Sequence, residues 1–412
     1  MSATLEAPGR MEQLRAEFPL LSRTVHGRPL VYLDSAATSQ KPRAVLRAMQ
    51  DFYERHNSNI HRGVYLLSEE ATAMHEAARA RVAEFLGVQA RELVFTRNAT
   101  EAINLVAYAW ARTHLRAGDA IVLTEMEHHA NLVPWHILRE ERGIEIRYLP
   151  VTPEGRLELS GLDRLLDGAR LLGVTHVSNV LGTVNPVREL ADRAHAAGAL
   201  VLVDGAQSAP HLPLRVPELG CDFFAFTGHK MLGPTGIGGL WARRELLEAM
   251  PPFLGGGDMI REVRLSGSKW NDVPFKFEAG TPAIAEAVGL GAAVEFMEGI
   301  GREEMRAHEA SLVDLAMRRL AEVPQLRILG PPAGERAAVV AFTLGALHPH
   351  DVAAVLDHEG VAVRAGHHCA MPVHEKLGVP ASARASFHVY NQASEIDALV
   401  RGLHRALTLF KV

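Results

Sequence analysis

The stretch from Ala199 to Lys230, "ALVLVDGAQSAPHLPLRVPELGCDFFAFTGHK", decides the fold. It holds two apolar runs, 199–207 and 221–230, and each of them ends in polar residues. Near-continuous apolar runs are typical of strands that helices cover on both faces, as in parallel sheets. The stretch therefore predicts two strands of a largely parallel sheet, with polar side chains at their carboxyl ends.

Similar runs surround this stretch and extend the same pattern. They alternate with helical patterns between about residues 90 and 245, at 92–96, 120–127, 145–151 and 171–179. Alternation of strands and helices is typical of an α/β fold with a doubly wound, mostly parallel sheet. In such sheets ligands bind beyond the carboxyl ends of the strands, which is where we look for chemistry.

The pattern changes after residue 285. Two long helical stretches, 285–301 and 302–323, precede strand-like pieces at 337–345, 361–366 and 383–391. This order predicts a smaller α+β domain. We expect a large domain over 20–285, and a small domain that joins residues 1–19 to 286–412.

The composition excludes several classes of protein. The 412 residues are 48% hydrophobic, carry a net charge of −5 and include two cysteines. We find no run of about 18 apolar residues, no leader pattern and no basic stripe. Two cysteines cannot form a disulfide framework. We therefore expect a cytoplasmic protein with no nucleic-acid or membrane partner, acting on a small molecule.

Asp204 and Lys230 follow neighbouring predicted strands and should face one crevice. Pyridoxal 5'-phosphate uses this pair, because a lysine forms a Schiff base with its aldehyde and a carboxylate keeps its pyridine nitrogen protonated. For either residue alone, a salt bridge at a loop is the simpler interpretation.

A phosphate site is predicted after the strand at 92–96. Asn98 and Glu101 have the spacing of a capping box, which places Ala99 and Thr100 in the first turn of a helix whose positive end can hold a phosphate. Most capping boxes only cap. Thr227 and His229 could add donors to the same anion, and the glycines of "GPTGIGG" (233–239) would let the backbone pass close behind Lys230.

Two further strand ends carry candidate side chains. His128, in "TEMEHHAN", could lie flat on the cofactor ring and move protons. Two adjacent histidines could also bind a metal, but no further ligand stands at the right spacing, so we expect no metal site. Asn179 could bond the ring oxygen or a substrate carboxylate, and the alternative is simply a turn.

Cys369 lies in "RAGHHCAMP" (364–372), which we expect to be a loop. Arg364, His367 and His368 make this loop electropositive, which favours the thiolate form and hence nucleophilicity. Most single cysteines in loops are inert, and a metal bound by "HHC" would have poor geometry. The other cysteine, Cys221, begins an apolar run and is predicted to be a small core residue.

Together these motifs resemble the SufS-type, or group II, cysteine desulfurases, in class V of the fold-type I pyridoxal-phosphate enzymes. The resemblance runs from about Tyr32 to the C-terminus. It rests on "YLDSAATSQKP", "MEHHANLVPW", "HVSNVLGT", "VDGAQS", "GHKMLGPTGIG", "FEAGTP", "RAGHHCAMP" and "RASFHVYN".

The resemblance implies a role for each matching residue. Lys230 would bind the cofactor covalently, Asp204 would pair with its pyridine nitrogen, Gln207 would bond the ring oxygen and His128 would stack on the ring. Thr100, Thr227 and His229, with Ala99 beside them, would hold the phosphate, and Thr281 would reach it from the second subunit of a homodimer. Arg384 and Asn179, with Arg364, would bind the substrate.

The same resemblance implies that L-cysteine is converted to L-alanine while Cys369 takes the sulfur as a persulfide. A sulfur-accepting protein of the SufE or SufU type and iron–sulfur cluster assembly would follow. "LHPHD" (347–351) is similar to relatives paired with a zinc-containing SufU, whose zinc His350 could contact; a surface turn is the alternative. A selenocysteine lyase, a class V aminotransferase and a non-catalytic assembly platform remain alternatives.

Overall fold

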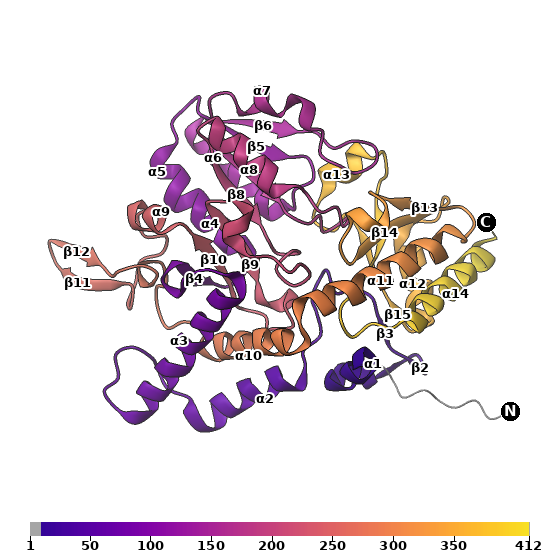
Figure 1. The fold of residues 1–412 in the computed structure, drawn as a ribbon, viewed down its shortest axis with the longest axis horizontal. Helices are drawn as coiled ribbons and strands as arrows, with labels where there is room; N and C mark the ends of the chain where they lie inside the picture. Colours follow the sequence, from indigo (N-terminus) through magenta and orange to yellow (C-terminus); the bar gives the residue numbers. More distant parts are fainter. Residues whose placement is uncertain (1–9, 412) are drawn as a thin grey trace.

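A seven-stranded sheet forms the centre of the larger lobe in the computed structural model, which describes residues 10–411 (Figure 1). Its strand order is β4, β10, β9, β8, β7, β5, β6. The pairs from β9 through β8, β7 and β5 to β6 are parallel. The strands are β4 (Leu93–Thr96), β5 (Ala120–Thr124), β6 (Glu145–Leu149), β7 (Ala169–Thr175), β8 (Leu200–Asp204), β9 (Phe223–Thr227) and β10 (Gly238–Ala242). The predicted α/β fold is confirmed.

Strand β10 is absent from the sequence prediction. It runs antiparallel to both β4 and β9. Glycine is depleted in strands, so "GIGGLWA" does not look like one. A Cβ atom on Gly238 would lie 2.6 Å from the Phe226 carbonyl oxygen and 2.8 Å from Asn98 Cα, which explains why glycine occupies this position.

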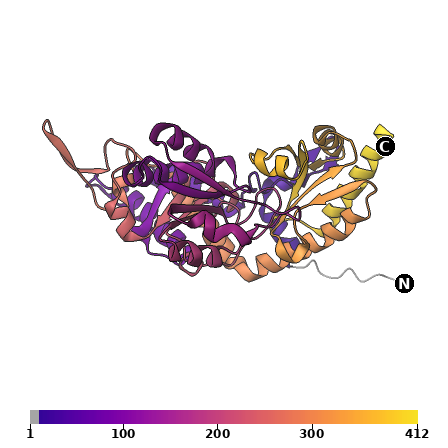
Figure 2. The ribbon, with the colours of Figure 1, turned by 90° about the horizontal axis from the view of Figure 1, so that it is seen from above.

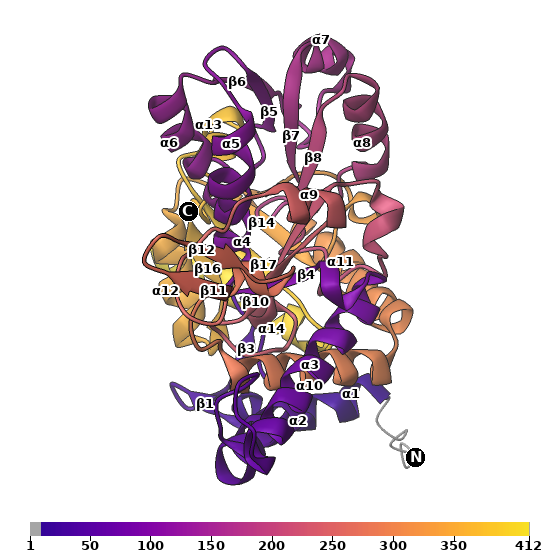
Figure 3. The same cartoon turned by 90° about the vertical axis from the view of Figure 1, so that its left-hand side faces the viewer.

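Helices cover both faces of this sheet. Along β8, Val201 and Val203 pack into one buried cluster, whereas Leu202 packs into another. Successive strand residues point to opposite faces, so both faces of β8 are apolar and buried. Helix α8 (Val187–Ala196) covers one face, and α4 (Ala99–Leu105) and α6 (Val133–Arg142) cover the other; Figure 3 shows α6 and α8 on opposite sides.

A four-stranded antiparallel sheet forms the smaller lobe, seen beside the first in Figure 2. Its order is β13 (Leu326–Leu329), β14 (Val339–Leu344), β17 (Ser382–Ser386), β16 (Arg364–Gly366). Helices α11 (Arg302–Ala321), α12 (Pro349–His358) and α14 (Ala393–Phe410) belong to the same lobe.

The two lobes are connected by a long helix and a short strand pair. Helix α10 (Ile284–Ile300) packs on α3 (Leu66–Leu86) and α2 (Arg43–Asp51), and it leads directly to α11. Strand β3 (Val31–Tyr32) pairs with β15 (Val361–Ala362). The division into 20–285 and 1–19 with 286–412 remains a prediction, and residues 1–9 lie outside the described part.

The remaining elements are short. The hairpin of β11 (Ile260–Arg264) and β12 (Gly267–Trp270) projects from the end of the larger lobe opposite the smaller one (Figures 1 and 2). The others are α1 (Arg10–Leu14), β1 (Thr24–Val25), β2 (Arg28–Pro29), α5 (Arg112–His114), α7 (Leu162–Leu166), α9 (Arg244–Ala249) and α13 (Met371–Lys376). Within residues 10–411, no helix has the length and apolarity that crossing a membrane requires.

Candidate active site

A cavity of about 280 Å³ lies beyond the carboxyl ends of the parallel strands, between the two lobes. The structure brings to it every predicted site residue except Thr281. The residues at its wall are Ala36, Ala37, Asn98, Ala99, Thr100, His128, Ala130, Thr175, Val177, Asn179, Asp204, Ala206, Gln207, Thr227, His229, Lys230, Arg364, His368, Cys369 and Arg384.

Asp204 and Lys230 reach this cavity from adjacent strands. Asp204 ends β8, is 5% exposed and accepts a hydrogen bond from the Ala206 N–H at 3.0 Å. Burial raises the pKa of Asp204, while the Ala206 bond and the charge of Lys230 oppose that rise. Desolvation lowers the pKa of Lys230 to about 8, although Asp204 acts the other way. The lysine therefore titrates much closer to neutrality than a free lysine does.

A short N-terminal segment holds the turn that carries Lys230. The carbonyl oxygen of His229 accepts hydrogen bonds from the Ser39 N–H (3.0 Å), the Ser39 hydroxyl (3.0 Å), the Thr38 hydroxyl (3.1 Å) and Lys41 Nζ (3.0 Å). Sequence reasoning missed this function of residues 38–41, because nothing local links them to a turn some 190 residues away.

The predicted phosphate end is built around the start of α4. Asn98 caps the helix by accepting the Glu101 N–H at 3.0 Å. The predicted reciprocal bond does not form, because the Glu101 carboxylate accepts from the Arg97 N–H and side chain instead. Ala99 and Thr100 occupy the first turn, at the cavity wall.

Thr227 and Gln207 each carry a buried polar atom that has no hydrogen-bond partner within residues 10–411. These atoms are Thr227 Oγ1 and Gln207 Oε1. Gln207 uses its Nε2 to donate to the Ala36 carbonyl oxygen at 2.8 Å. Buried polar atoms are rarely left unpaired, so two of them at one cavity are consistent with a polar ligand there.

His128 is neutral at the cavity wall. Its Nδ1 accepts the Ala130 N–H at 3.0 Å, so the neutral ring carries its proton on Nε2. Desolvation, together with nearby positive charges such as Lys230, lowers its pKa to about 3. The ring can therefore donate from Nε2 at neutral pH.

Two arginines from the small sheet share one carboxylate. Asp34 accepts hydrogen bonds from Arg364 at 3.1–3.2 Å and from Arg384 Nη2 at 3.2 Å. Arg384 also donates to the Asn179 carbonyl oxygen at 2.9 Å, and its buried Nε has no partner in the described part of the chain. The sequence prediction gave Asp34 no role, although it lies in the quoted "YLDSAATSQKP".

Cys369 is exposed in a short segment that the larger lobe holds in place. His368 and Cys369 have φ values of 52° and 57°, a region that few residues other than glycine adopt. Asn179 Nδ2 donates to the His368 carbonyl oxygen at 2.6 Å, and the His129 N–H donates to the Cys369 carbonyl oxygen at 2.7 Å. Two consecutive carbonyls thus tie the cysteine segment to the large sheet.

Two expectations about this segment need correction. Arg364–Gly366 form β16, as the strand-like piece predicted at 361–366 implies, and α13 begins at Met371, so the loop expected over 364–372 is reduced to 367–370. His368 supplies no positive charge, since burial lowers its pKa to about 2. The positive groups around Cys369 are Arg364, Arg384 and Lys230. Cys221, by contrast, is 4% exposed within the core, as predicted, and burial raises the pKa of its thiol.

Thr281 lies elsewhere. It lines a separate hollow that includes Glu278 and Pro282, within the segment following η10 (Phe275–Phe277). Its expected approach from a second subunit remains a prediction.

The cavity has the groups that pyridoxal phosphate requires. Lys230 offers an amine, Asp204 a buried carboxylate, His128 a flat neutral ring, and the α4 start with Thr227 offers donors for a phosphate. The unpartnered Gln207 Oε1 can accept a bond from a ring hydroxyl. The residues present therefore fit this group.

Comparison with known proteins identifies the family. The class-V aminotransferase family model matches residues 31–399. A probable cysteine desulfurase of Streptomyces coelicolor is 53% identical, over 98% of this chain and 99% of its own, and a cysteine desulfurase of Haloferax volcanii is 49% identical, over 98% of each. The apo structure of a cysteine desulfurase from Thermococcus onnurineus covers 99% of this chain and all of its own, with 40% identity and a TM-score of 0.92. The chain therefore belongs to the class-V aminotransferase family, among its cysteine desulfurases.

Proposed function

We propose that this pyridoxal-phosphate enzyme converts L-cysteine to L-alanine and holds the sulfur on Cys369 as a persulfide for transfer to an acceptor protein. The supporting observation is the position of Cys369, exposed at the same cavity wall as Lys230, Asp204 and two arginines. An enzyme of this family that only transferred amino groups would have no use for a cysteine at this position. Supply of sulfur for iron–sulfur cluster assembly, in the manner of SufS, is part of the proposal, as is a cytoplasmic location.

Arg384 and Arg364 are proposed to bind the substrate carboxylate. Asp34 offsets one of their two positive charges, which leaves one for an incoming anion. The unpartnered Arg384 Nε supplies an N–H for it, and a charge-assisted bond in a buried site is among the stronger hydrogen bonds. Asn179 orients this end by holding the His368 carbonyl.

Lys230 and Cys369 are proposed to carry out different steps of the reaction, a proton transfer and the attack on sulfur. When bound, pyridoxal phosphate supplies an aldehyde that combines with amines and a ring that accepts electrons. Lys230 Nζ takes the proton from the substrate Cα, and His128 orients the reacting groups through its Nε2–H. Cys369 Sγ attacks the substrate sulfur: a sulfur–sulfur bond forms, the carbon–sulfur bond breaks, and the carbon left behind gains a proton. One cysteine and the Cys369 thiol thus give one alanine and a Cys369 persulfide.

Mass spectrometry after a brief exposure of the holoenzyme to L-cysteine tests this proposal. We expect the peptide containing Cys369 to gain one sulfur atom, with an equal amount of alanine formed in the first turnover. Alanine without an adduct on Cys369 would refute the persulfide mechanism, and formation of neither product would refute the desulfurase function.

The acceptor is proposed to be of the SufE or SufU type, with His350 near a partner's zinc. His350 is exposed at the start of α12, and its N–H donates to Nδ1 of His348, whose ring lies 4.9 Å from its own. We expect His350→Ala to slow sulfur transfer to a zinc-containing acceptor about tenfold and to leave alanine formation in the first turnover unchanged. Equal transfer rates, measured with labelled sulfur, would remove this contact.

A homodimer is also proposed. Val64, Tyr65, Leu66 and Leu67 are exposed and apolar in sequence, as is Leu265 at the tip of the β11–β12 hairpin. Contiguous exposed apolar side chains favour an interface. Sedimentation of the holoenzyme tests this state.

A further inference from the structure

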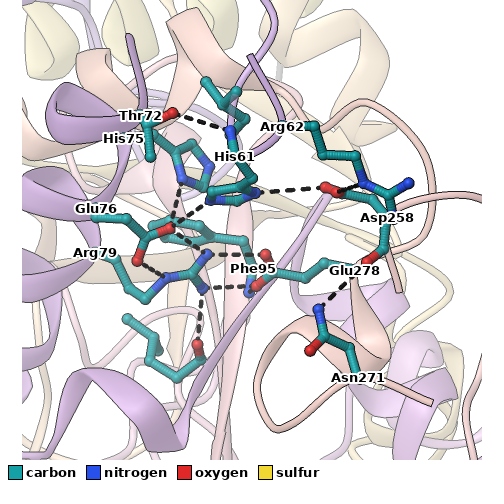
Figure 4. A network of polar contacts seen from close by, with 12 residues as sticks. His61, Arg62, Thr72, His75, Glu76, Arg79, Phe95, Asp258, Asn271 and Glu278 are labelled. Atoms are coloured by element: carbon teal, nitrogen blue, oxygen red, sulfur yellow. Dashed lines mark hydrogen bonds and ion pairs between the residues drawn. The ribbon is translucent and has the colours of Figure 1, made fainter. Parts of the chain in front are cut away.

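A second group of chemically active side chains lies outside the cavity, on α3 and the loop before it (Figure 4). Glu76 Oε1 is 3.1 Å from His61 Nε2 and 3.1 Å from His75 Nδ1. The three ligand atoms all lie within 4.8 Å of one another. Two imidazole nitrogens and one carboxylate oxygen at this spacing match a zinc ligand set with one position left for water.

The surrounding residues hold two of these ligands in the orientation that a metal needs. Asp258 Oδ2 lies 3.5 Å from Nδ1 of His61, the ring nitrogen that points away from Glu76. Metal-binding histidines commonly donate their second N–H to a carboxylate in this way. On the other side, Arg79 Nε donates to Glu76 Oε2 at 3.0 Å and Arg79 Nη2 donates to Oε1 at 3.3 Å, which fixes the carboxylate with Oε1 facing the histidines.

The charge of this cluster is balanced by a buried ion pair. Arg79 is 1% exposed and donates to both Glu278 oxygens, at 2.6 and 2.8 Å. Although desolvation opposes it, the contacts with His61, His75 and Arg79 hold the pKa of Glu76 well below its usual range. Glu76 Oε1 lies at the point where His61, His75 and Arg79 converge, so a metal ion would take over the contacts that the two histidines now make with it.

His75 has a second ring nitrogen, Nε2, that could carry the proton if Nδ1 bound a metal. The side chain is fully buried, and its Nε2 has no hydrogen-bond partner within residues 10–411. Its ring lies 5.4 Å from that of Phe95 at 77°, an edge-to-face contact. If Nδ1 binds a metal, the proton moves to Nε2, which has no other hydrogen bond to lose.

We propose that His61 Nε2, His75 Nδ1 and Glu76 Oε1 bind one divalent ion of the zinc class, with Asp258 and Arg79 as the groups that orient the ligands. This departs from the sequence prediction of no metal site. His61 and Glu76 stand 15 residues apart, and only the folding of the loop onto α3 brings them together.

Binding exchanges one proton for the metal. In the metal-free state His61 Nε2 donates its proton to Glu76 Oε1, 3.1 Å away. The ion displaces this proton to solvent, while His75 keeps its proton by moving it to Nε2.

The ion would act as a structural link. It would join the loop carrying His61 and the segment carrying Asp258 to α3, beside the Arg79–Glu278 pair. Glu278 stands three residues before Thr281, so the link would steady the segment that is expected to reach a second subunit. The inference does not depend on the proposed sulfur chemistry.

Titration of the holoenzyme with Zn²⁺ tests this site. The Cys369→Ser background removes the exposed thiolate as a competing ligand. After treatment with a chelator and dialysis, we expect one Zn²⁺ per chain by calorimetry and elemental analysis, and a higher Tm. His61→Asn and His75→Phe should each weaken binding at least about 100-fold, whereas the exposed His26→Asn serves as the matched control and should bind normally. Co²⁺ should give visible d–d bands that both site variants lose.

Three results would overturn the proposal: no retained Zn²⁺ in the folded holoenzyme, equal binding in His61→Asn and the background protein, or Co²⁺ bands that persist in both site variants. Far-UV circular dichroism and the cofactor absorbance establish folding. If buried His75→Phe does not fold, the partly exposed His61→Asn decides, because its side chain is 19% exposed. All readouts are taken without turnover, so they stand apart from the desulfurase assay.

Discussion

Replacement of Cys369 by serine is expected to abolish sulfur transfer to an acceptor while leaving the bound cofactor intact. Serine is similar to cysteine in size and has to adopt the same left-handed backbone conformation at this position, but its hydroxyl is a far weaker nucleophile toward sulfur. We expect the rate of alanine formation from L-cysteine to fall by more than about 10³-fold, a range typical of removing a nucleophile. Stopped-flow measurement of alanine, with mass spectrometry of residue 369, checks this.

The chain offers a matched control, because residues 10–411 contain one other free cysteine. Cys221→Ala alters a buried core residue, so it should lower stability slightly and leave the persulfide on Cys369 unchanged. Unaltered alanine formation in Cys369→Ser would mean that the sulfur leaves the substrate without a protein nucleophile.

Replacement of Lys230 by alanine has the second large expected effect. On the proposed mechanism the variant loses both the covalent attachment of the cofactor and the group that moves the α-proton. Removal of such an acid–base group typically costs about 10²–10⁴-fold in rate. We expect the near-visible absorbance of the covalently held cofactor to disappear, together with desulfurase activity. Absorbance spectra and alanine assays measure both effects on one sample.

Lys269, an exposed residue on β12, provides the control for this change. Lys269→Ala should retain the absorbance and the activity. A Lys230→Ala protein that still showed the full absorbance and turned over at the original rate would refute the assignment of this lysine.

The sequence predicts the large sheet well for a physical reason. Its parallel strands are buried on both faces, so their apolar runs stand out, and polar residues at the strand ends meet in one cavity because parallel strands share an edge. Asp204, Lys230, His128 and Asn179 were located by this rule, while their chemical roles remain predictions. Thr281 was not located by it, since it follows no strand of this sheet.

The missed features depend on contacts that no local pattern encodes. The glycines of β10 make its sequence unlike that of a strand, and Gly238 is needed because Phe226 and Asn98 approach its backbone closely. Asp34 joins two arginines some 330 and 350 residues away. His368 looks like a source of charge in sequence, but its burial among other side chains makes it neutral. Each of these features depends on residues that only the folded chain brings together.

The position of Cys369 between the lobes has a geometric consequence. Cys369, the proposed nucleophile, and both guanidinium groups are carried by β16, β17 and the segment that follows β16. Asp204 ends β8 of the larger sheet, and Lys230 lies in the turn directly after β9. A translation of the small lobe would therefore move Cys369 and the two guanidinium groups together. Their distances from one another would stay the same, while their distances from Lys230 would change. The hydrogen bonds that Asn179 and His129 donate to the His368 and Cys369 carbonyl oxygens define the position from which such a movement would start.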